Sequence, residues 1–262
     1  MNAEALSAIR AFELRLVSEA IRGHFGARRD ILVLDVGAGT GEQAALLSEL
    51  GYQVTALDIG SSAYKGRRVF PVQDYDGVRL PLDDESVDVV FSSNLLEHLL
   101  PLEPLLSEMA RVLRRTGIAV HVVPSASWRV WTTLLHPAWV FKRAVQFLLG
   151  KRRPPPMLGT DSLSVRERPG GLRLLLPSRH GERGNFVTET WYFSTRWWAR
   201  KFRALNWELE RVSACGVFYS GTMLLGNALR LGARTALARV LGSSSTLFVL
   251  RYGPSRDVAR GD

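Results

Sequence analysis

A carboxylate followed by three glycines at alternate positions is the pattern in this chain best suited to chemistry. An apolar run over 31–34 ends in the acid, and a helical run over 42–50 follows the last glycine. The four residues are Asp35, Gly37, Gly39 and Gly41. A strand that ends in glycines and opens a helix is typical of a nucleotide-binding turn. Glycine suits this turn because a Cβ would hold a ligand away from the backbone and resist positive φ.

The spacing of the glycines argues against a dinucleotide as the ligand. A dinucleotide fingerprint has its third glycine three residues after the second, and Glu42 occupies that position here. Asp35 would also repel a phosphate. A carboxylate at this point suits a ligand that carries an ammonium or sulfonium charge.

A second acid stands where nucleotide-binding folds bind a ribose. The apolar run 53–58 predicts a strand, and Asp58 closes it about twenty residues after the glycines. In α/β nucleotide folds a carboxylate at this place accepts hydrogen bonds from the ribose hydroxyls. Taken alone, an acid at a strand end is more often a helix cap or part of a solvated turn.

These segments together resemble the class I S-adenosylmethionine-dependent methyltransferases, in the branch of ubiquinone and menaquinone biosynthesis. The run 35–41 resembles motif I of that family, and 80–92 resembles the segment that leads into its fourth strand. The segment 93–99 matches the stretch after that strand, and 105–123 matches the next helix, glycine turn and fifth strand. The likeness covers residues 28–124 continuously.

The resemblance implies S-adenosyl-L-methionine as the cofactor. In the family the first acid lies near the methionine end of the cofactor, and a third acid contacts the adenine amino group. Asp76 fits that third position best, with Asp74 as the alternative. The implied cofactor-binding residues are Asp35, Gly37, Ala38, Gly39, Gly41, Asp58, Ile59, Asp76 and Asn94.

The alternation of strand and helix patterns predicts an α/β fold in a single domain over 1–262. We expect a doubly wound, seven-stranded, mostly parallel sheet with an antiparallel last strand and a cap insertion after strand five. A helix is expected over 3–25. The expected strands are 31–36, 53–58, about 68–72, 87–92, 118–123, 207–213 and 246–252. A helix capped by Ser194 is expected before the last two strands.

The cap insertion, 124–192, departs from a minimal methyltransferase. Between positions 128 and 183 there are eleven basic and three acidic residues, a net +8 against +9 for the whole chain. A helix expected over 136–150, with Pro137 in its first turn, has a wide apolar face and a basic polar face. That pattern is typical of an interfacial membrane helix, and equally of a buried helix that lines a pocket. A second amphipathic run, 224–242, favours a packed surface helix over a membrane contact.

The net charge and the apolar content of the chain together indicate which class of partner it binds. A pI of about 10.3 is common in nucleic-acid-binding proteins. However, the Asn-Pro-Pro-aromatic tetrad of base-amino methyltransferases is missing at 92–95, and the insertion is too apolar for a solvated phosphate groove. We therefore expect a small-molecule, lipid or glycan acceptor and an anionic membrane surface, with RNA as the alternative. A single cysteine and no run long enough to span a bilayer predict a cytoplasmic protein, peripheral at the membrane.

A hydroxyl acceptor needs a base to remove its proton as the methyl bond forms. His98 follows strand four at the edge where the methyl group should point, although such a Glu-His pair is often structural. A second set, His180, Asn185 and Glu189, lies in a polar loop that resembles a substrate lid or a solvated loop. His98, His180 and Glu189 are the catalytic candidates, His136 is predicted to be a helix cap, and no metal is expected. A cofactor-binding membrane adaptor without turnover is the alternative of a different class.

Overall fold

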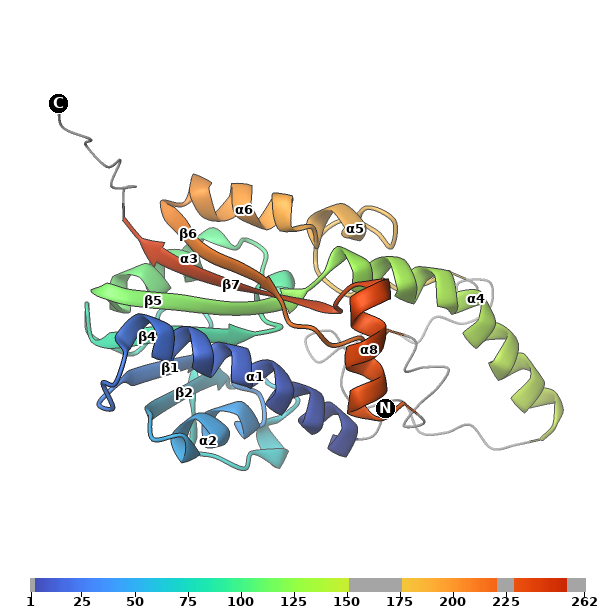
Figure 1. The fold of residues 1–262 in the computed structure, drawn as a ribbon, viewed down its shortest axis with the longest axis horizontal. Coiled ribbons are helices and arrows are strands. Elements are labelled where there is room, and N and C mark those ends of the chain that lie inside the picture. Colours follow the sequence, from blue (N-terminus) through green and yellow to red (C-terminus); the bar gives the residue numbers. More distant parts are fainter. Residues whose placement is uncertain (1–2, 151–175, 221–228, 254–262) are drawn as a thin grey trace.

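The computed structural model describes residues 3–150, 176–220 and 229–253, which are organised around one seven-stranded sheet (Figure 1). The strand order is β3-β2-β1-β4-β5-β7-β6. Strands β1 to β5 pair in parallel, and β7 is antiparallel to both of its neighbours. The strands are β1 (Leu32–Val36), β2 (Gln53–Ile59), β3 (Val72–Tyr75), β4 (Val87–Ser93), β5 (Leu113–Pro124), β6 (Trp207–Ala214) and β7 (Ser245–Tyr252). The predicted fold class is confirmed.

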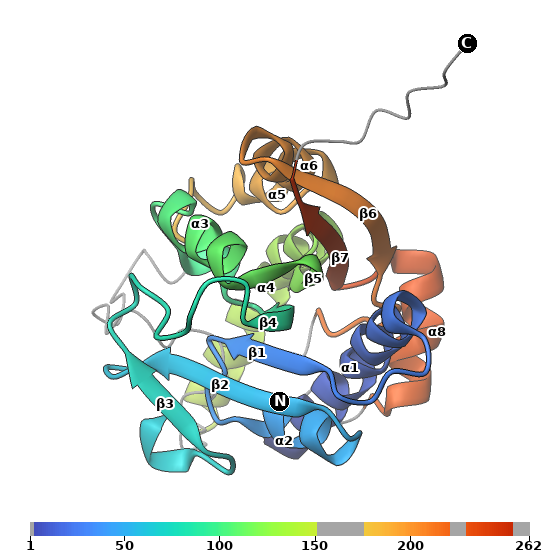
Figure 2. The same ribbon diagram turned by 90° about the vertical axis from the view of Figure 1, so that its left-hand side faces the viewer.

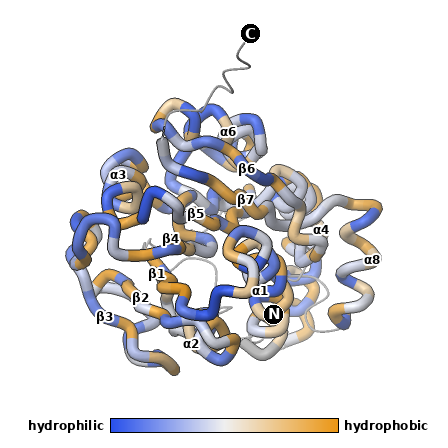
Figure 3. Tube along the Cα trace, turned by 60° about the vertical axis from the view of Figure 1, so that its left-hand side comes forward, coloured by the Kyte–Doolittle hydropathy of each residue, from blue (hydrophilic) through white to orange (hydrophobic). Residues whose placement is uncertain are grey.

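Helices cover both faces of the sheet, which is why the central strands are apolar on both sides (Figure 2). The helices α3 (Glu103–Val112) and α6 (Thr195–Ala204) pack on the face that contains Leu34 and Val90. The opposite face, which contains Val33 and Val89, is covered by α1 (Ala3–Phe25) and α2 (Glu42–Glu49). Figure 3 shows the hydrophobic residues along β1, whereas α1 mixes hydrophobic and hydrophilic residues.

The remaining helices lie near the carboxyl ends of β5 and β6. They are α4 (Ala126–Leu148), the short α5 (Glu189–Tyr192) and α8 (Leu231–Leu241), whereas the 3-10 turns η1 (Lys65–Arg67) and η2 (Leu96–His98) follow β2 and β4. The start of α4 is joined to the end of α8, because Ser127 Oγ and Trp131 Nε1 both donate to the Leu241 carbonyl, at 2.7 and 2.9 Å. Residues 151–175 of the cap insertion and 224–228 of the second amphipathic run lie outside the described residues.

Three predicted elements were wrong in their bounds. The fifth strand was expected over 118–123 but begins at Leu113, so the glycine turn expected before it lies within the strand. The third strand was expected over about 68–72 but spans Val72–Tyr75, because 65–67 form a 3-10 turn and Pro71 has no amide to donate. The helix expected over 136–150 begins ten residues earlier, where Ser125 caps it by accepting from the Trp128 amide at 3.0 Å. Pro137 therefore lies inside α4.

His136 is accordingly not a helix cap. It is a buried residue in the middle of α4, and its ring lies 5.3 Å from that of Trp139. Other local predictions are confirmed: Ser194 caps α6 by accepting from the Trp197 amide at 3.2 Å, and Cys215 is a buried free cysteine. In the part of the chain that the structure describes, no helix is long and apolar enough to cross a membrane.

Candidate cofactor and acceptor site

The glycine turn between β1 and α2 has the backbone shape that the sequence predicted. Gly37, Gly39 and Gly41 have φ of 76°, 58° and 78°, which residues with a side chain rarely adopt. The Gly37 and Ala38 amides both donate to the Leu57 carbonyl of β2, at 2.8 and 3.0 Å. A Cβ on Gly37 would lie 2.8 Å from a methyl carbon of Leu95, which follows β4. The turn is thus held between the ends of β2 and β4.

Asp58 fastens the turn from the end of β2. One carboxylate oxygen accepts from the Gly39 amide at 3.1 Å, and the other accepts from the Ile59 amide at 2.9 Å. The side chain is buried. Each oxygen keeps a second lone pair that a ribose hydroxyl could use.

Asp35 lies under the same turn and is nearly inaccessible to solvent. Its Oδ2 receives no hydrogen bond from the described residues. Burial raises the pKa of Asp35 to about 7, and the neighbouring Asp58 adds to this rise. A buried carboxyl group with a free oxygen beside bare backbone is suited to a cationic ligand.

The other predicted cofactor residues lie around the same edge. Asp76 follows β3 and accepts from the Val78 and Arg79 amides at 2.8 and 2.9 Å. Burial raises the pKa of Tyr75 to about 12, with further contributions from Asp58 and Asp76, so both acids lie near its hydroxyl. The alternative acid, Asp74, is paired with Lys65 and Arg68.

Asn94 directly follows β4, has a φ of 53°, and lies beside a residue that sequence reasoning missed, Arg10 of α1. With its amide oxygen turned toward Arg10, Asn94 accepts hydrogen bonds at 2.5 and 3.1 Å. Burial alone would lower the pKa of Arg10, but Glu13 above all, then Tyr219 and Glu97, raise it above its ordinary value. No sequence signal marked Arg10 among the other charged residues of an amphipathic helix.

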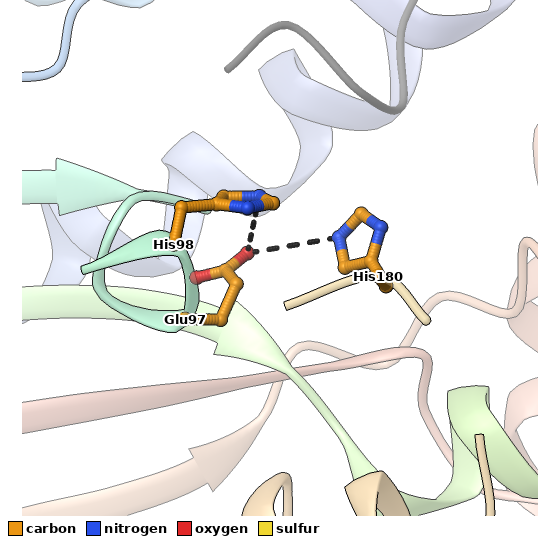
Figure 4. Close-up of side chains that lie close together, drawn as sticks. All are labelled: Glu97, His98 and His180. Carbon is orange, nitrogen blue, oxygen red and sulfur yellow. Dashed lines mark ion pairs between the residues drawn. The ribbon is translucent and has the colours of Figure 1, made fainter. Parts of the chain in front are cut away.

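Two of the predicted catalytic residues meet beside this turn, together with a third residue (Figure 4). His98 comes from η2, His180 comes from the insertion, and their ring centroids are 5.0 Å apart. Glu97 Oε1 lies 3.8 Å from His98 Nε2 and 3.9 Å from His180 Nε2. Sequence reasoning did not select Glu97, although the Glu-His pair contained the signal.

Burial sets the protonation of this cluster. It lowers the pKa of His180 to about 3, with help from His98, and lowers the pKa of His98, where Glu182 acts in the opposite direction. It also raises the pKa of Glu97 to about 8. At neutral pH both imidazoles are therefore neutral, Glu97 is mostly protonated, and the low pKa of His180 makes it a weak proton acceptor.

Aromatic rings from the insertion border the cluster. The Trp128 ring of α4 lies 4.7 Å from the His180 ring and 6.1 Å from that of Phe193. Phe193 thus lies beside the cluster, with its ring 6.2 Å from that of His180. Tyr192 makes an edge contact with Trp197, at 5.5 Å, on the side of the core.

Glu189, the third predicted catalytic residue, holds the loop that carries His180. Its Oε1 accepts from the His180 and Gly181 amides, both at 2.7 Å, and its Oε2 lies 3.2 Å from Arg129 Nη1. Arg129 of α4 also donates to the Phe186 and Ser178 carbonyls, both at 3.0 Å. Both side chains of the pair are buried. Asn185, the other member of that set, caps a turn by accepting from the Val187 and Thr188 amides.

Comparison with known proteins agrees with this geometry. Residues 34–121 match the model of a family described as a methyltransferase domain, which agrees with the resemblance seen in the sequence. The fold around it is that of the class I methyltransferases.

The names of two relatives say more than the family model does. A protein named "Probable S-adenosylmethionine-dependent methyltransferase" from Mycobacterium tuberculosis is 36% identical over 97 residues, which cover 36% of this chain and 35% of the relative. Demethylmenaquinone methyltransferase from Beutenbergia cavernae is 37% identical over 107 residues, which cover 39% of this chain and 45% of the relative. The chain thus spans less than half the length of either relative.

Among solved structures, geranyl diphosphate C-methyltransferase from Streptomyces coelicolor A3(2) superposes with a TM-score of 0.50. It is 15% identical, and the alignment covers 91% of this chain and 77% of that one. This likeness concerns the fold alone.

We expect the pair of Glu189 and Arg129 to be structural. Because Glu189→Ala leaves Arg129 buried without its partner, the variant should lose about 3–5 kcal/mol in the free energy of unfolding. The double variant Glu189→Ala/Arg129→Met should lose clearly less than the sum of the two single losses, as measured by urea unfolding. Arg115→Ala, in an exposed pair with Glu85, is the control and should change little. Strictly additive losses would contradict the coupling.

Proposed function

We propose that this chain is an S-adenosylmethionine-dependent methyltransferase that methylates a hydroxyl group on an amphipathic acceptor, such as a lipid or a lipid-linked glycan. One observation carries the proposal. Leu95 packs against Gly37 of the glycine turn, and the cluster of Glu97, His98 and His180 begins two residues later. A site for a charged donor and a set of proton-accepting groups therefore share one edge of the sheet.

The residues around the turn fit S-adenosylmethionine. Asp35 would lie near the methionine end, where its free oxygen suits a positively charged group. Asp58 would accept from the ribose hydroxyls, and Asp76 is proposed for the adenine. The bare backbone at Gly37, Gly39 and Gly41 allows the ligand to approach closely.

When bound, the cofactor supplies a methyl group whose bond to sulfur breaks as the acceptor oxygen bonds to carbon, with the electron pair returning to sulfur. The acceptor hydroxyl must lose its proton in this step. His98 is placed to take it, because its imidazole is neutral, whereas the lower pKa of His180 makes that ring the weaker proton acceptor. The chain's main contribution is to align the acceptor with the methyl group.

The surface of the insertion supports an amphipathic acceptor. Large apolar side chains recur on α4 at i, i+7, i+11 and i+14, and each is exposed; they are Leu134, Phe141, Val145 and Leu148. We call these four residues the α4 stripe. Lys142 and Arg143 lie beside it in sequence and suit anionic head groups. Figure 1 shows the end of α4 projecting from the rest of the fold. We propose that the stripe contacts an anionic membrane that presents the acceptor.

The first test is transfer of labelled methyl groups from S-adenosylmethionine to lipid, glycan and RNA fractions of a cell extract. We expect label in the lipid or glycan fraction. His98→Ala and His180→Ala should each lower the rate by about 100-fold or more if that residue takes the proton. His24→Ala is the control: His24 lies in the last turn of α1, outside the cluster, and the variant should not change the rate. Label confined to RNA, or full rates in both variants, would contradict the proposal.

A second prediction concerns pH. Because the pKa of Asp35 is raised to about 7, this carboxyl is mostly protonated at pH 6 and mostly ionised at pH 8. Affinity for the cationic cofactor should therefore increase by up to about tenfold from pH 6 to pH 8, as measured by calorimetry. Asp35→Asn should be nearly flat over this range and weaker at pH 8. Glu97→Gln, a change in another buried acid, should keep the increase. If the affinity of Asp35→Asn increased with pH as much as that of the wild type, the assignment of Asp35 to the cofactor site would be contradicted.

A third prediction tests the membrane contact. Phe141→Glu and Leu148→Glu should abolish co-sedimentation with vesicles that contain an anionic lipid, because each places a charge on the α4 stripe. Leu50→Glu, at an exposed apolar position that ends α2, should pellet like the wild type. Equal pelleting of all the proteins would rule out the stripe as the contact.

A further inference from the structure

Three side chains that can bind a metal ion converge beside the glycine turn. One carboxylate oxygen of Glu97 and one ring nitrogen each of His98 and His180 lie within 4.8 Å of one another. Figure 4 shows the Glu97 oxygen facing both imidazoles. Two imidazoles and a carboxylate are a common ligand set for zinc and related divalent ions, and a carboxyl group releases its proton when it binds such an ion.

The present contacts do not explain this arrangement as a hydrogen-bond network. The separations of 3.8 and 3.9 Å between Glu97 Oε1 and the two Nε2 atoms are too long for hydrogen bonds. The Glu97 side chain is fully buried, and neither of its oxygens has a hydrogen-bond partner among the described residues. A buried acid in this state costs stability, and a bound cation would remove that cost.

We propose that Glu97, His98 and His180 bind a divalent transition-metal ion of the zinc type through Glu97 Oε1 and the two Nε2 atoms. This differs from the sequence-based expectation of no metal. In a tetrahedral zinc site, bonds of about 2.0–2.1 Å place ligand atoms roughly 3.3–3.5 Å apart. Small side-chain rotations would close the cluster from its present separations to that geometry.

The chain positions each of the three ligands from the backbone. His98 and Glu97 belong to η2, which directly follows β4, and the Glu97 carbonyl accepts from the Glu182 amide at 3.0 Å. Glu189 holds the His180 amide, and Arg129 holds Glu189. A Cβ on Gly181 would lie 2.9 Å from the Glu97 carbonyl oxygen, so the two loops are in close contact. Such support outside the ligand shell is typical of metal sites.

Three protein ligands leave one position of a tetrahedral ion for water or an acceptor oxygen. With the ion bound, the imidazoles would be ligands and could not act as the proposed bases; a hydroxyl group in the fourth position would lose its proton more readily, and the proton would pass to solvent water. The resulting oxygen would then bond to the methyl carbon as the carbon–sulfur bond breaks. This role rests on the proposed methyl transfer, whereas the binding of the ion does not.

The test is a titration of the full chain, first treated with a chelator and dialysed, with Co²⁺ as the probe. We expect the visible absorption bands of tetrahedral Co²⁺ at one ion per chain, and their loss when Zn²⁺ displaces the probe. His98→Ala, His180→Gln and Glu97→Gln should each weaken binding by at least tenfold. His24→Ala should bind like the wild type. Circular dichroism and binding of S-adenosylmethionine show that each variant is folded.

Wild type and His98→Ala with equal affinity for Co²⁺, or no tetrahedral bands in the wild type, would overturn the proposal. The result is independent of the methyltransferase assignment. A chain that binds S-adenosylmethionine but no Co²⁺ would refute the metal site alone. A chain that binds Co²⁺ through these residues but does not bind S-adenosylmethionine would refute the proposed function alone.

Discussion

The close contact between Gly37 and Leu95 is the constraint on which the site depends. Parallel strands end at one edge of a sheet, so the turn after β1 and the segment after β4 must share the same space. Gly37 has a φ of 76°, which residues with a side chain rarely adopt, and a Cβ there would lie 2.8 Å from the end of the Leu95 side chain, so glycine favours the close approach of the two segments. The glycine turn proposed to bind the cofactor and the cluster of Glu97, His98 and His180 are thereby brought to one edge of the sheet.

The insertion supplies the residues that hold His180 in place, because the parallel strands do not reach this part of the site. Its first helix, α4, carries Arg129 into the interior, where the guanidinium meets Glu189 and two carbonyls of the 176–188 loop. Glu189 in turn holds the backbone amide of His180. A buried ion pair thus positions His180, one member of the proposed acceptor site. Because the pair is buried, its contribution to stability depends on the hydrogen-bond geometry of Arg129 and Glu189 as well as on their charges.

Much of the fold could be predicted because its signals are local. Alternating apolar strands, the glycines after β1 and the Ser194 cap each act within a few residues. The third strand was misplaced because Pro71, which cannot donate to the ladder, lay within the expected run. The start of α4 was missed because Pro137 was assigned to a first turn, whereas Ser125 provides the cap.

The site was predictable only where it follows the strands. Asp35, Asp58 and His98 stand at strand ends, and chain order alone places them at one edge. Arg10 and Arg129 reach the site from helices, and nothing local distinguishes them from other surface arginines. The part played by Glu189 depends on how the insertion folds back over α4, which sequence spacing does not encode. Its proximity to His180 in the sequence suggested catalysis, whereas its contacts are those of a positioning residue.

Titration calorimetry of the purified chain with S-adenosylmethionine, S-adenosylhomocysteine and a nicotinamide dinucleotide tests the central claim most directly. The account predicts saturable binding of the first two at a single site and no binding of the dinucleotide, because Asp35 and the glycine spacing are unsuited to a pyrophosphate. Binding of the dinucleotide, or no binding of S-adenosylmethionine, would contradict it.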